Sequence, residues 1–318
     1  MQYTKGLKKT KFQKNALIDQ VVKVGLFSFA LLSASFIFIV IGVILVKGAT
    51  PFFTDNNGLG AVNFFTFITG DTWLTGSSFQ SNLYSIGFII VSTIFIAFLS
   101  LFLSFPVGVL TALFIAKVAP KRLANFLRTV VEMLASIPSI IYGLFGAGII
   151  LKFVYNASAL IGYQSKGGNS IIASVIVLAI MTIPTIASIS EVAIRSVDKD
   201  LEHGSLALGA SVTQTNFKVV LAAAKSGIFT SAILGIGRVL GEATAVSLVA
   251  GGRRSGYSFD ILDTTSTLTT IMLEGLKETT GLDYDIRFSV GIILMFVILL
   301  TNLTLNAIKK KVGGIDVK

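Results

Sequence analysis

Cysteine is absent from this 318-residue sequence, and histidine occurs once, at His203. Without cysteine the chain can form neither a disulfide nor a thiolate metal site, and one histidine cannot build a histidine cluster. The sequence also lacks a phosphate-binding P-loop and a nucleophile elbow. We therefore expect no catalytic residue, no bound metal and no cofactor in this chain.

Charged residues are scarce too, at 13%, whereas hydrophobic residues make up 53%. Soluble domains carry about 25% charged residues, so this composition is typical of a membrane protein. A membrane-spanning helix needs about 20 apolar residues. Stretches of that kind cover residues 24–46, 83–116, 129–151, 167–190, 226–252 and 288–308. The sequence predicts an all-α integral membrane protein with six transmembrane helices.

The net charge of +10 could indicate a nucleic-acid-binding protein, but the basic residues are distributed by topology. Eighteen of the 26 Lys and Arg residues lie before the first span, after the last, or in the loops that follow the second and fourth spans. Seven lie in the other loops, and Arg238 lies within a span. By the positive-inside rule both termini are cytoplasmic, and we expect a multi-pass protein in the cell membrane, surrounded by lipid, with no nucleic-acid partner.

No linker or visible internal repeat divides the chain. We expect a basic cytoplasmic segment over residues 1–23 and a single transmembrane domain over 24–318, with outer loops at about 47–82 and 251–287. Proline removes a helix hydrogen bond. Pro106 is the expected break in the long second span, while Pro138 and Pro184 lie within the third and fourth. These prolines are either hinges or residues that membrane helices simply tolerate.

The fifth span carries two charges, Arg238 and Glu242, in a setting where charge is costly and usually marks function. Four residues apart on a helix, they share one face and can pair directly. They are either a neutral pair that fixes packing or a guanidinium that binds an oxyanion, with the glutamate as its counter-ion. Small residues on this span predict close helix packing at Gly235, Gly237 and Gly241. Glu132, near the cytoplasmic end of the third span, either reaches toward water or contributes to the same pathway.

The cytoplasmic segment at about residues 198–222 is too polar to cross a bilayer, yet it has an interrupted amphipathic pattern. Gly209 interrupts that pattern near its middle, so two short helices with a bend between them are expected. The apolar face of this element contacts either the membrane surface or a partner protein.

Three stretches of the sequence resemble a known family. They are Glu132-Met-Leu-Ala-Ser-Ile-Pro-Ser-Ile-Ile-Tyr-Gly143, the segment from His203 to Ala222, and Leu234-Gly-Ile-Gly-Arg-Val-Leu-Gly-Glu242. The chain resembles the permease subunits of bacterial ABC importers, and most closely the PstC-type permease of phosphate importers. The resemblance implies the type I permease fold and transport of inorganic phosphate by alternating access, with ATP hydrolysed by a separate subunit.

The resemblance also implies partners: a second homologous permease in a heterodimer, two ATP-binding subunits and an extracytoplasmic phosphate-binding protein. It assigns phosphate passage to Arg238 and Glu242. It places the ATPase-coupling motif at Glu202, His203, Gly204, Ser205 and Gly209, although this chain has His-Gly-Ser where the family motif has Glu-Ala-Ala, and Ala222 where the motif ends in proline. A permease for another oxyanion and an ion-gradient secondary transporter remain the alternatives.

Overall fold

The structure is a computed structural model that describes residues 3–58, 60–74 and 83–313. Positions 1–2, 59, 75–82 and 314–318, which belong to the expected N-terminal segment, first outer loop and C-terminal end, lie outside the described residues. Every regular element in the described ranges is helical, beside three isolated β-bridges. The α-helices are α1 Tyr3–Phe53, α2 Phe64–Thr69, α3 Gly87–Leu113, α4 Lys121–Ser136, α5 Ser139–Phe145, α6 Leu151–Leu160, α7 Ile171–Arg195, α8 Lys199–Ala207, α9 Val212–Gln214, α10 Leu221–Leu240, α11 Thr244–Ser247, α12 Leu268–Leu273 and α13 Leu282–Gly313. Short η segments complete the set: the 3-10 turn η1 Asn56–Gly58 and the π-helical η2 Phe114–Val118, η3 Gly146–Ile150 and η4 Thr215–Val220.

Within the described residues, six helical stretches are long and apolar enough to cross a bilayer, which confirms the all-α membrane fold. They are Asp19–Phe53, Gly87–Val118, Ser139–Leu160, Ile171–Arg195, Val212–Leu240 and Leu282–Lys311. Several boundaries differ from the expected ones, and the fifth span, for example, begins at Val212 instead of residue 226. The third span begins at Ser139 because the chain turns at Ile137 and Pro138, which separates α4 from it. The fifth ends at Leu240 because Gly241 ends α10.

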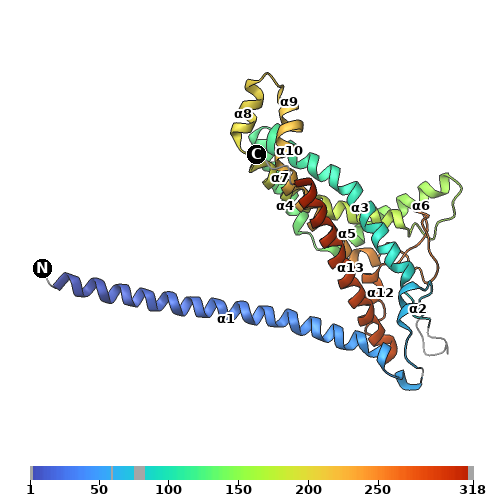
Figure 1. Cartoon of the computed structure of the whole chain (residues 1–318). Helices are drawn as coiled ribbons and strands as arrows, with labels where there is room; N and C mark the ends of the chain where they lie inside the picture. Colours follow the sequence, from blue (N-terminus) through green and yellow to red (C-terminus); the bar gives the residue numbers. More distant parts are fainter. Residues whose placement is uncertain (1–2, 59, 75–82, 314–318) are drawn as a thin grey trace.

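Helix α7 forms the centre of the bundle, with α3 and α10 packed against it (Figure 1). Glycines on α3 and α10 permit this close contact around Ile186 of α7. A Cβ atom at Gly108 of α3 would lie 2.7 Å from Ile186 Cγ2, and one at Gly235 of α10 would lie 3.2 Å from the Ile186 side chain. Helices that meet through glycine can approach closely, so the expected packing role of Gly235 has a direct structural counterpart.

Helix α1 is 51 residues long and extends away from the bundle (Figure 1). Among the described residues, α1 packs mainly against α13, near the C-terminal end of α1. There the Ser289 hydroxyl donates to the Gly48 carbonyl oxygen at 2.6 Å. The apolar side chains of α1 between Asp19 and Val46 are almost all exposed.

The prolines occupy two kinds of position. Helix α3 continues through Pro106 to Leu113 and then widens into the π-helical η2, so the expected break at Pro106 is wrong. Pro184 also lies inside a continuous helix, α7. Pro138 instead stands between α4 and α5, where Tyr142 OH donates to the Leu134 carbonyl oxygen at 2.7 Å across the turn. Of the three, Pro138 is therefore the one that lies between two helices.

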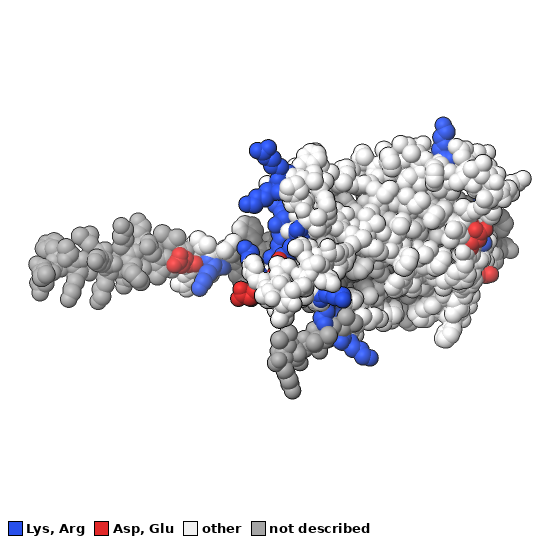
Figure 2. All heavy atoms as spheres, turned by 90° about the horizontal axis from the view of Figure 1, so that it is seen from above, with Lys and Arg blue, Asp and Glu red and all other residues white. Residues whose placement is uncertain are grey.

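Charge is concentrated at one end of the bundle. Figure 2 shows Lys and Arg side chains gathered near the end from which α8 and α9 project, beside a broad uncharged surface. The helix termini at this end carry Lys117, Lys121, Arg122, Arg195 and Lys199. An uncharged surface bounded by a basic end is the distribution that a bilayer requires.

Candidate functional site

Arg238 lies in the last turn of α10 rather than near the middle of a longer span. Its Nη1 donates to the Thr185 hydroxyl oxygen at 2.5 Å. At 1.5 Å per residue, Thr185 lies about 21 Å from the Ile171 end of α7 and about 15 Å from the Arg195 end. The guanidinium is therefore held near mid-depth of the central helix, at a half-buried position.

Glu242 follows the end of α10 and does not share a helix face with Arg238. The Gly241 N–H bonds to the Gly237 carbonyl at 3.2 Å and closes the helix. The Glu242 carboxylate then accepts, through Oε1, from the Thr244 hydroxyl at 2.8 Å and the Ala245 N–H at 3.0 Å. The expected direct pair is thus wrong: no ion pair joins these two residues in the described structure, because the helix that would align them ends between them.

Hydrogen bonds from hydroxyl groups connect the segment that contains Glu242 and Thr244 to α5 and α12. Ser139, the first residue of α5, shares a hydrogen bond of 2.9 Å with Thr244 of α11. Thr269 of α12 donates to the Glu242 carbonyl oxygen at 2.8 Å. We call Arg238, Thr185, Glu242, Thr244 and Ser139 the Arg238 site. It comprises two hydrogen-bonded groups, Arg238 with Thr185 between α10 and α7, and Glu242 with Thr244 and Ser139 between α11 and α5. Together they offer one cation, one carboxylate and several hydroxyls.

The remaining glycines of this segment lie beside open space. A Cβ atom at Gly237 would meet nothing within 4 Å, and one at Gly241 would meet only carbonyl oxygens of its own helix, the nearer at 3.5 Å. Close packing of these two positions against another helix stays a prediction that requires a second subunit.

Glu132 is exposed on α4 and makes no hydrogen bond or ion pair to the Arg238 site. Arg128, one turn earlier on α4, is the cation that it faces, and the charge of Glu132 contributes to raising the pKa of that arginine, after the larger effect of Glu191. A pathway role for Glu132 stays a prediction. Among the described residues, His, Asp and Glu form no group of three that could hold a metal ion.

The predicted bent element projects from the basic end of the bundle (Figure 1). Gly209, between α8 and α9, has φ of +86°, a left-handed conformation that glycine adopts at low cost. Asp198 caps α8, and Ser211 caps α9 in a capping box with Gln214. At the bend Leu208 is 90% exposed. The bend at Gly209 and the short helix before it are therefore confirmed. The second helix is not short, because α9, η4 and α10 continue without a break as the span Val212–Leu240.

The coupling residues divide between the two sides of this element. Glu202 forms an ion pair with Lys117 of η2, and Ser205 shares a hydrogen bond of 2.9 Å with Thr215 of η4. His203 and Gly204 are exposed. Glu202 and Ser205 thus fix the element to the bundle, and the exposed residues are free to contact a partner.

Glu191 forms an ion-pair cluster that the sequence reasoning did not identify. The residue is 5% exposed. Its Oε1 accepts from Arg128 Nη2 at 2.6 Å and from Arg195 Nε at 2.7 Å. Arg195 Nη2 also donates to the Ile115 carbonyl at 3.2 Å. We call Glu191, Arg128 and Arg195 the Glu191 cluster; it joins α4, α7 and η2 directly before the start of α8.

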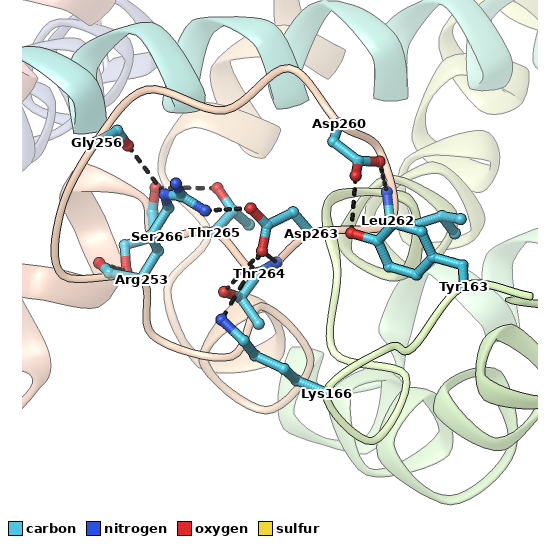
Figure 3. Close-up of polar contacts among 10 residues, drawn as sticks. All are labelled: Tyr163, Lys166, Arg253, Gly256, Asp260, Leu262, Asp263, Thr264, Thr265 and Ser266. Atoms are coloured by element: carbon cyan, nitrogen blue, oxygen red, sulfur yellow. Dashed lines mark hydrogen bonds and ion pairs between the residues drawn. The ribbon is translucent and has the colours of Figure 1, made fainter.

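At the opposite end, Asp263 joins the two loops at residues 161–170 and 251–266 (Figure 3). It pairs with Arg253 and lies 4.0 Å from Lys166 Nζ. Burial alone would raise the pKa of Asp263, but the Thr264 N–H and the Arg253 guanidinium lower it below its usual range. The neighbouring Tyr163 donates to Asp260 Oδ2 at 2.7 Å, which with burial raises the pKa of Tyr163 to about 12.

Thr185 and Ser139 were also missed, because a hydroxyl residue in an apolar span is ordinary in sequence. Thr185 does follow Pro184 directly, and Ser139 follows Pro138. A hydroxyl next to a proline in a membrane helix is a signal that could have selected both.

The chain matches the family model described as "Binding-protein-dependent transport system inner membrane component" over residues 104–313. It is 34% identical over 253 residues to YqgH of Bacillus subtilis, described as a probable ABC transporter permease protein, with 79% of this chain and 77% of that protein covered. It is 29% identical over 287 residues to the phosphate transport system permease protein PstC 1 of Mycobacterium bovis, with 80% and 85% covered.

Two solved structures have a similar fold. A bacterial alginate ABC transporter in complex with its alginate-bound periplasmic protein aligns with a TM-score of 0.62 at 19% identity, covering 93% of this chain and 98% of that one. The inward-facing MetNI methionine ABC transporter aligns with a TM-score of 0.55 at 20% identity, covering 70% and 94%.

Proposed function

This chain belongs to the family of binding-protein-dependent transport system inner membrane components, and we propose that it forms one half of an ATP-driven pore that imports inorganic phosphate. The observation that supports an anion path is Arg238: a half-buried guanidinium at mid-depth of the bundle whose described partner is a neutral hydroxyl. Arginine stays charged at any accessible pH and offers a planar set of donors that suits oxyanions.

Phosphate is favoured over other oxyanions by Glu242. Both described bonds to its carboxylate reach Oε1, and no described residue donates to Oε2. A carboxylate accepts hydrogen bonds but cannot donate them. Hydrogen phosphate keeps a P–OH group at neutral pH and can donate to Glu242, whereas sulfate has no proton and is repelled. Several relatives, including the one from Mycobacterium bovis, are named phosphate transport permeases, which supports the same substrate class.

The energy for transport comes from partner subunits in this proposal. The bent element of α8 and α9 docks on an ATP-binding subunit through its exposed side, where Leu208 and His203 lie. Its movement reaches the bundle through Glu202 and the Glu191 cluster, which connect α8 and α7 to η2 and α4. A second, homologous permease completes the pore as a heterodimer, and two ATP-binding subunits and an external phosphate-binding protein complete the complex. In this arrangement the basic end and both termini face the cytoplasm.

The experiment reconstitutes the full complex that copurifies with the tagged chain into proteoliposomes with ATP at the cytoplasmic face. Uptake of radiolabelled phosphate is then measured with the binding protein outside, in competition with sulfate and molybdate. We expect uptake that requires ATP, that survives collapse of the proton gradient, and that excess sulfate does not inhibit.

The same assay with Arg238→Gln tests the site. Since the guanidinium is the only cation in the Arg238 site, this variant should assemble normally and transport at less than a hundredth of the wild-type rate. Wild-type transport by an assembled Arg238→Gln complex contradicts the role of the arginine. Uptake that follows the proton gradient and ignores ATP indicates a secondary transporter, and preferential sulfate uptake indicates another oxyanion permease.

A further inference from the structure

The hydroxyl of Thr185 differs from its neighbours on α7. Thr182 and Ser174 donate their hydroxyl protons to carbonyl oxygens four residues earlier, Leu178 at 2.6 Å and Ser170 at 3.0 Å. Such bonds satisfy a hydroxyl within its own helix and leave nothing for a ligand. The Thr185 oxygen instead accepts from Arg238, and no described acceptor receives its proton. Thr185 thus keeps a donor available at the same point as the guanidinium.

The guanidinium itself retains most of its donors. Arginine has five N–H groups, and the described contacts of Arg238 use one of them. No described carboxylate lies within ion-pair distance of it. The hydroxyl oxygen of Thr185 accepts a hydrogen bond but carries no charge, so it does not neutralise the positive charge of the half-buried Arg238. An oxyanion would supply the missing charge.

The position of Thr185 on α7 also allows it to orient the Arg238 side chain. The Thr185 hydroxyl lies near the middle of α7, whereas Arg238 is on α10, so their bond spans the contact between the two helices. The long arginine side chain has many rotamers, and a fixed acceptor on the central helix limits them. A guanidinium that is already positioned binds its ligand at lower entropic cost.

We propose that Thr185 is the residue that positions Arg238 and the second donor to the transported oxyanion. In the empty site its oxygen holds the guanidinium in place. When an oxyanion arrives, Arg238 donates to one of its oxygens and the Thr185 O–H donates to another. This role rests on the proposed function, and it extends that function by assigning recognition of the anion to a hydroxyl on α7 that neither motif nor charge marks.

The test compares Thr185→Val with Thr185→Ser in the reconstituted complex, measuring phosphate uptake over a range of concentrations delivered by the binding protein. Valine keeps the shape of threonine and removes the hydroxyl, whereas serine keeps the hydroxyl. One hydrogen bond to a charged group corresponds to about a 10- to 100-fold change in affinity. We expect the phosphate concentration for half-maximal uptake to rise about 10- to 100-fold in Thr185→Val and less than about 3-fold in Thr185→Ser.

Thr182→Val is the matched control, since Thr182 is buried one turn earlier and its hydroxyl serves its own helix. It should leave the half-maximal concentration unchanged. Wild-type kinetics in Thr185→Val overturn the proposal, as does equal impairment of the serine variant, which would mean that packing rather than the hydroxyl matters. If the wild-type complex transports phosphate and Thr185→Val transports it equally well, only the role of Thr185 is contradicted. A wild-type complex that transports no oxyanion overturns both proposals.

Discussion

Arg238 and Glu242 lie four residues apart, yet each bonds to a different helix: Arg238 to Thr185 of α7, and Glu242 to the first turn of α11. The end of α10 at Leu240 separates them. In this structure the cation and the carboxylate do not neutralise each other. Our proposal assigns both to one protonated oxyanion, which has the complementary groups for each.

Glu242→Gln should relax selectivity rather than abolish transport. Glutamine keeps an acceptor for Thr244 and Ala245 but removes the negative charge that repels sulfate. We expect excess sulfate to inhibit phosphate uptake at least about tenfold more strongly than in wild type, since about 1.4 kcal/mol of lost repulsion corresponds to a factor of ten. Competition uptake in proteoliposomes measures this ratio.

Glu278→Gln is the control for the same charge change at an exposed position outside the Arg238 site. It should leave the sulfate ratio unchanged. An unchanged sulfate ratio in Glu242→Gln, or an equal change in both variants, would show that Glu242 does not determine the selectivity of transport.

Glu191→Gln should loosen α4 from α7. The change leaves Arg128 and Arg195 without their shared counter-ion, and breaking a buried ion pair costs about 3 kcal/mol or somewhat less where the arginines are partly solvated. Hydrogen exchange of the α4 amides should then be faster by about two orders of magnitude. Glu202→Gln removes a carboxylate that is more exposed than that of Glu191 and pairs with one cation, Lys117, instead of two. It should cost less than Glu191→Gln and leave α4 protected. Equal protection of α4 in both variants would show that the cluster does not hold it.

Gly209→Ala should weaken coupling through backbone strain alone. A Cβ atom at Gly209 meets nothing within 4 Å, but its φ of +86° costs a non-glycine residue about 1 to 2 kcal/mol. Gly204→Ala is a matched control, since Gly204 is also free of neighbours but lies inside α8, where alanine is favoured by about 1 kcal/mol. We expect less ATPase to copurify with Gly209→Ala than with wild type, and at least the wild-type amount with Gly204→Ala. Equal recovery from the two variants would argue against the bend as a docking feature.

The ion pairs of Asp263 with Arg253 and Lys166 predict a defined pH dependence. Because the pKa of Asp263 is lowered in the folded protein, its stabilising contribution is complete above the ordinary aspartate value of about 3.9 and is lost as the pH falls through the lower, folded pKa. Asp263→Asn should therefore speed exchange of the 251–266 amides at neutral pH, and this difference should shrink below about pH 3.9. A difference that grows toward acid would contradict the sign of the shift.

The number and type of the spanning helices were predictable, because long apolar runs without charge have few other solutions. Helix ends were harder to predict. Gly241 looked like one more small residue in a helix, and only the structure shows that it ends α10 and prevents the pair expected between Arg238 and Glu242. The reverse error occurred at Pro106, where α3 continues.

The bent coupling element was predictable in outline because Gly209 marks its turn in sequence. Thr185 and Glu191 were not, since each depends on which helix lies opposite. Thr185 gains a role from α10, and Glu191 gains one from α4, contacts between residues 53 and 63 positions apart in the chain. A single sequence carries no information on such pairings.

Helix α1 packs against α13, although the two lie far apart in the chain (Figure 1). About 230 residues separate the end of α1 at Phe53 from the start of α13 at Leu282, so translation at about 5 to 20 residues per second takes roughly 10 to 45 s between them. During that interval α1 lacks the helix that it packs against among the described residues. Its exposed apolar surface suits a helix that must be stable in lipid before α13 is made.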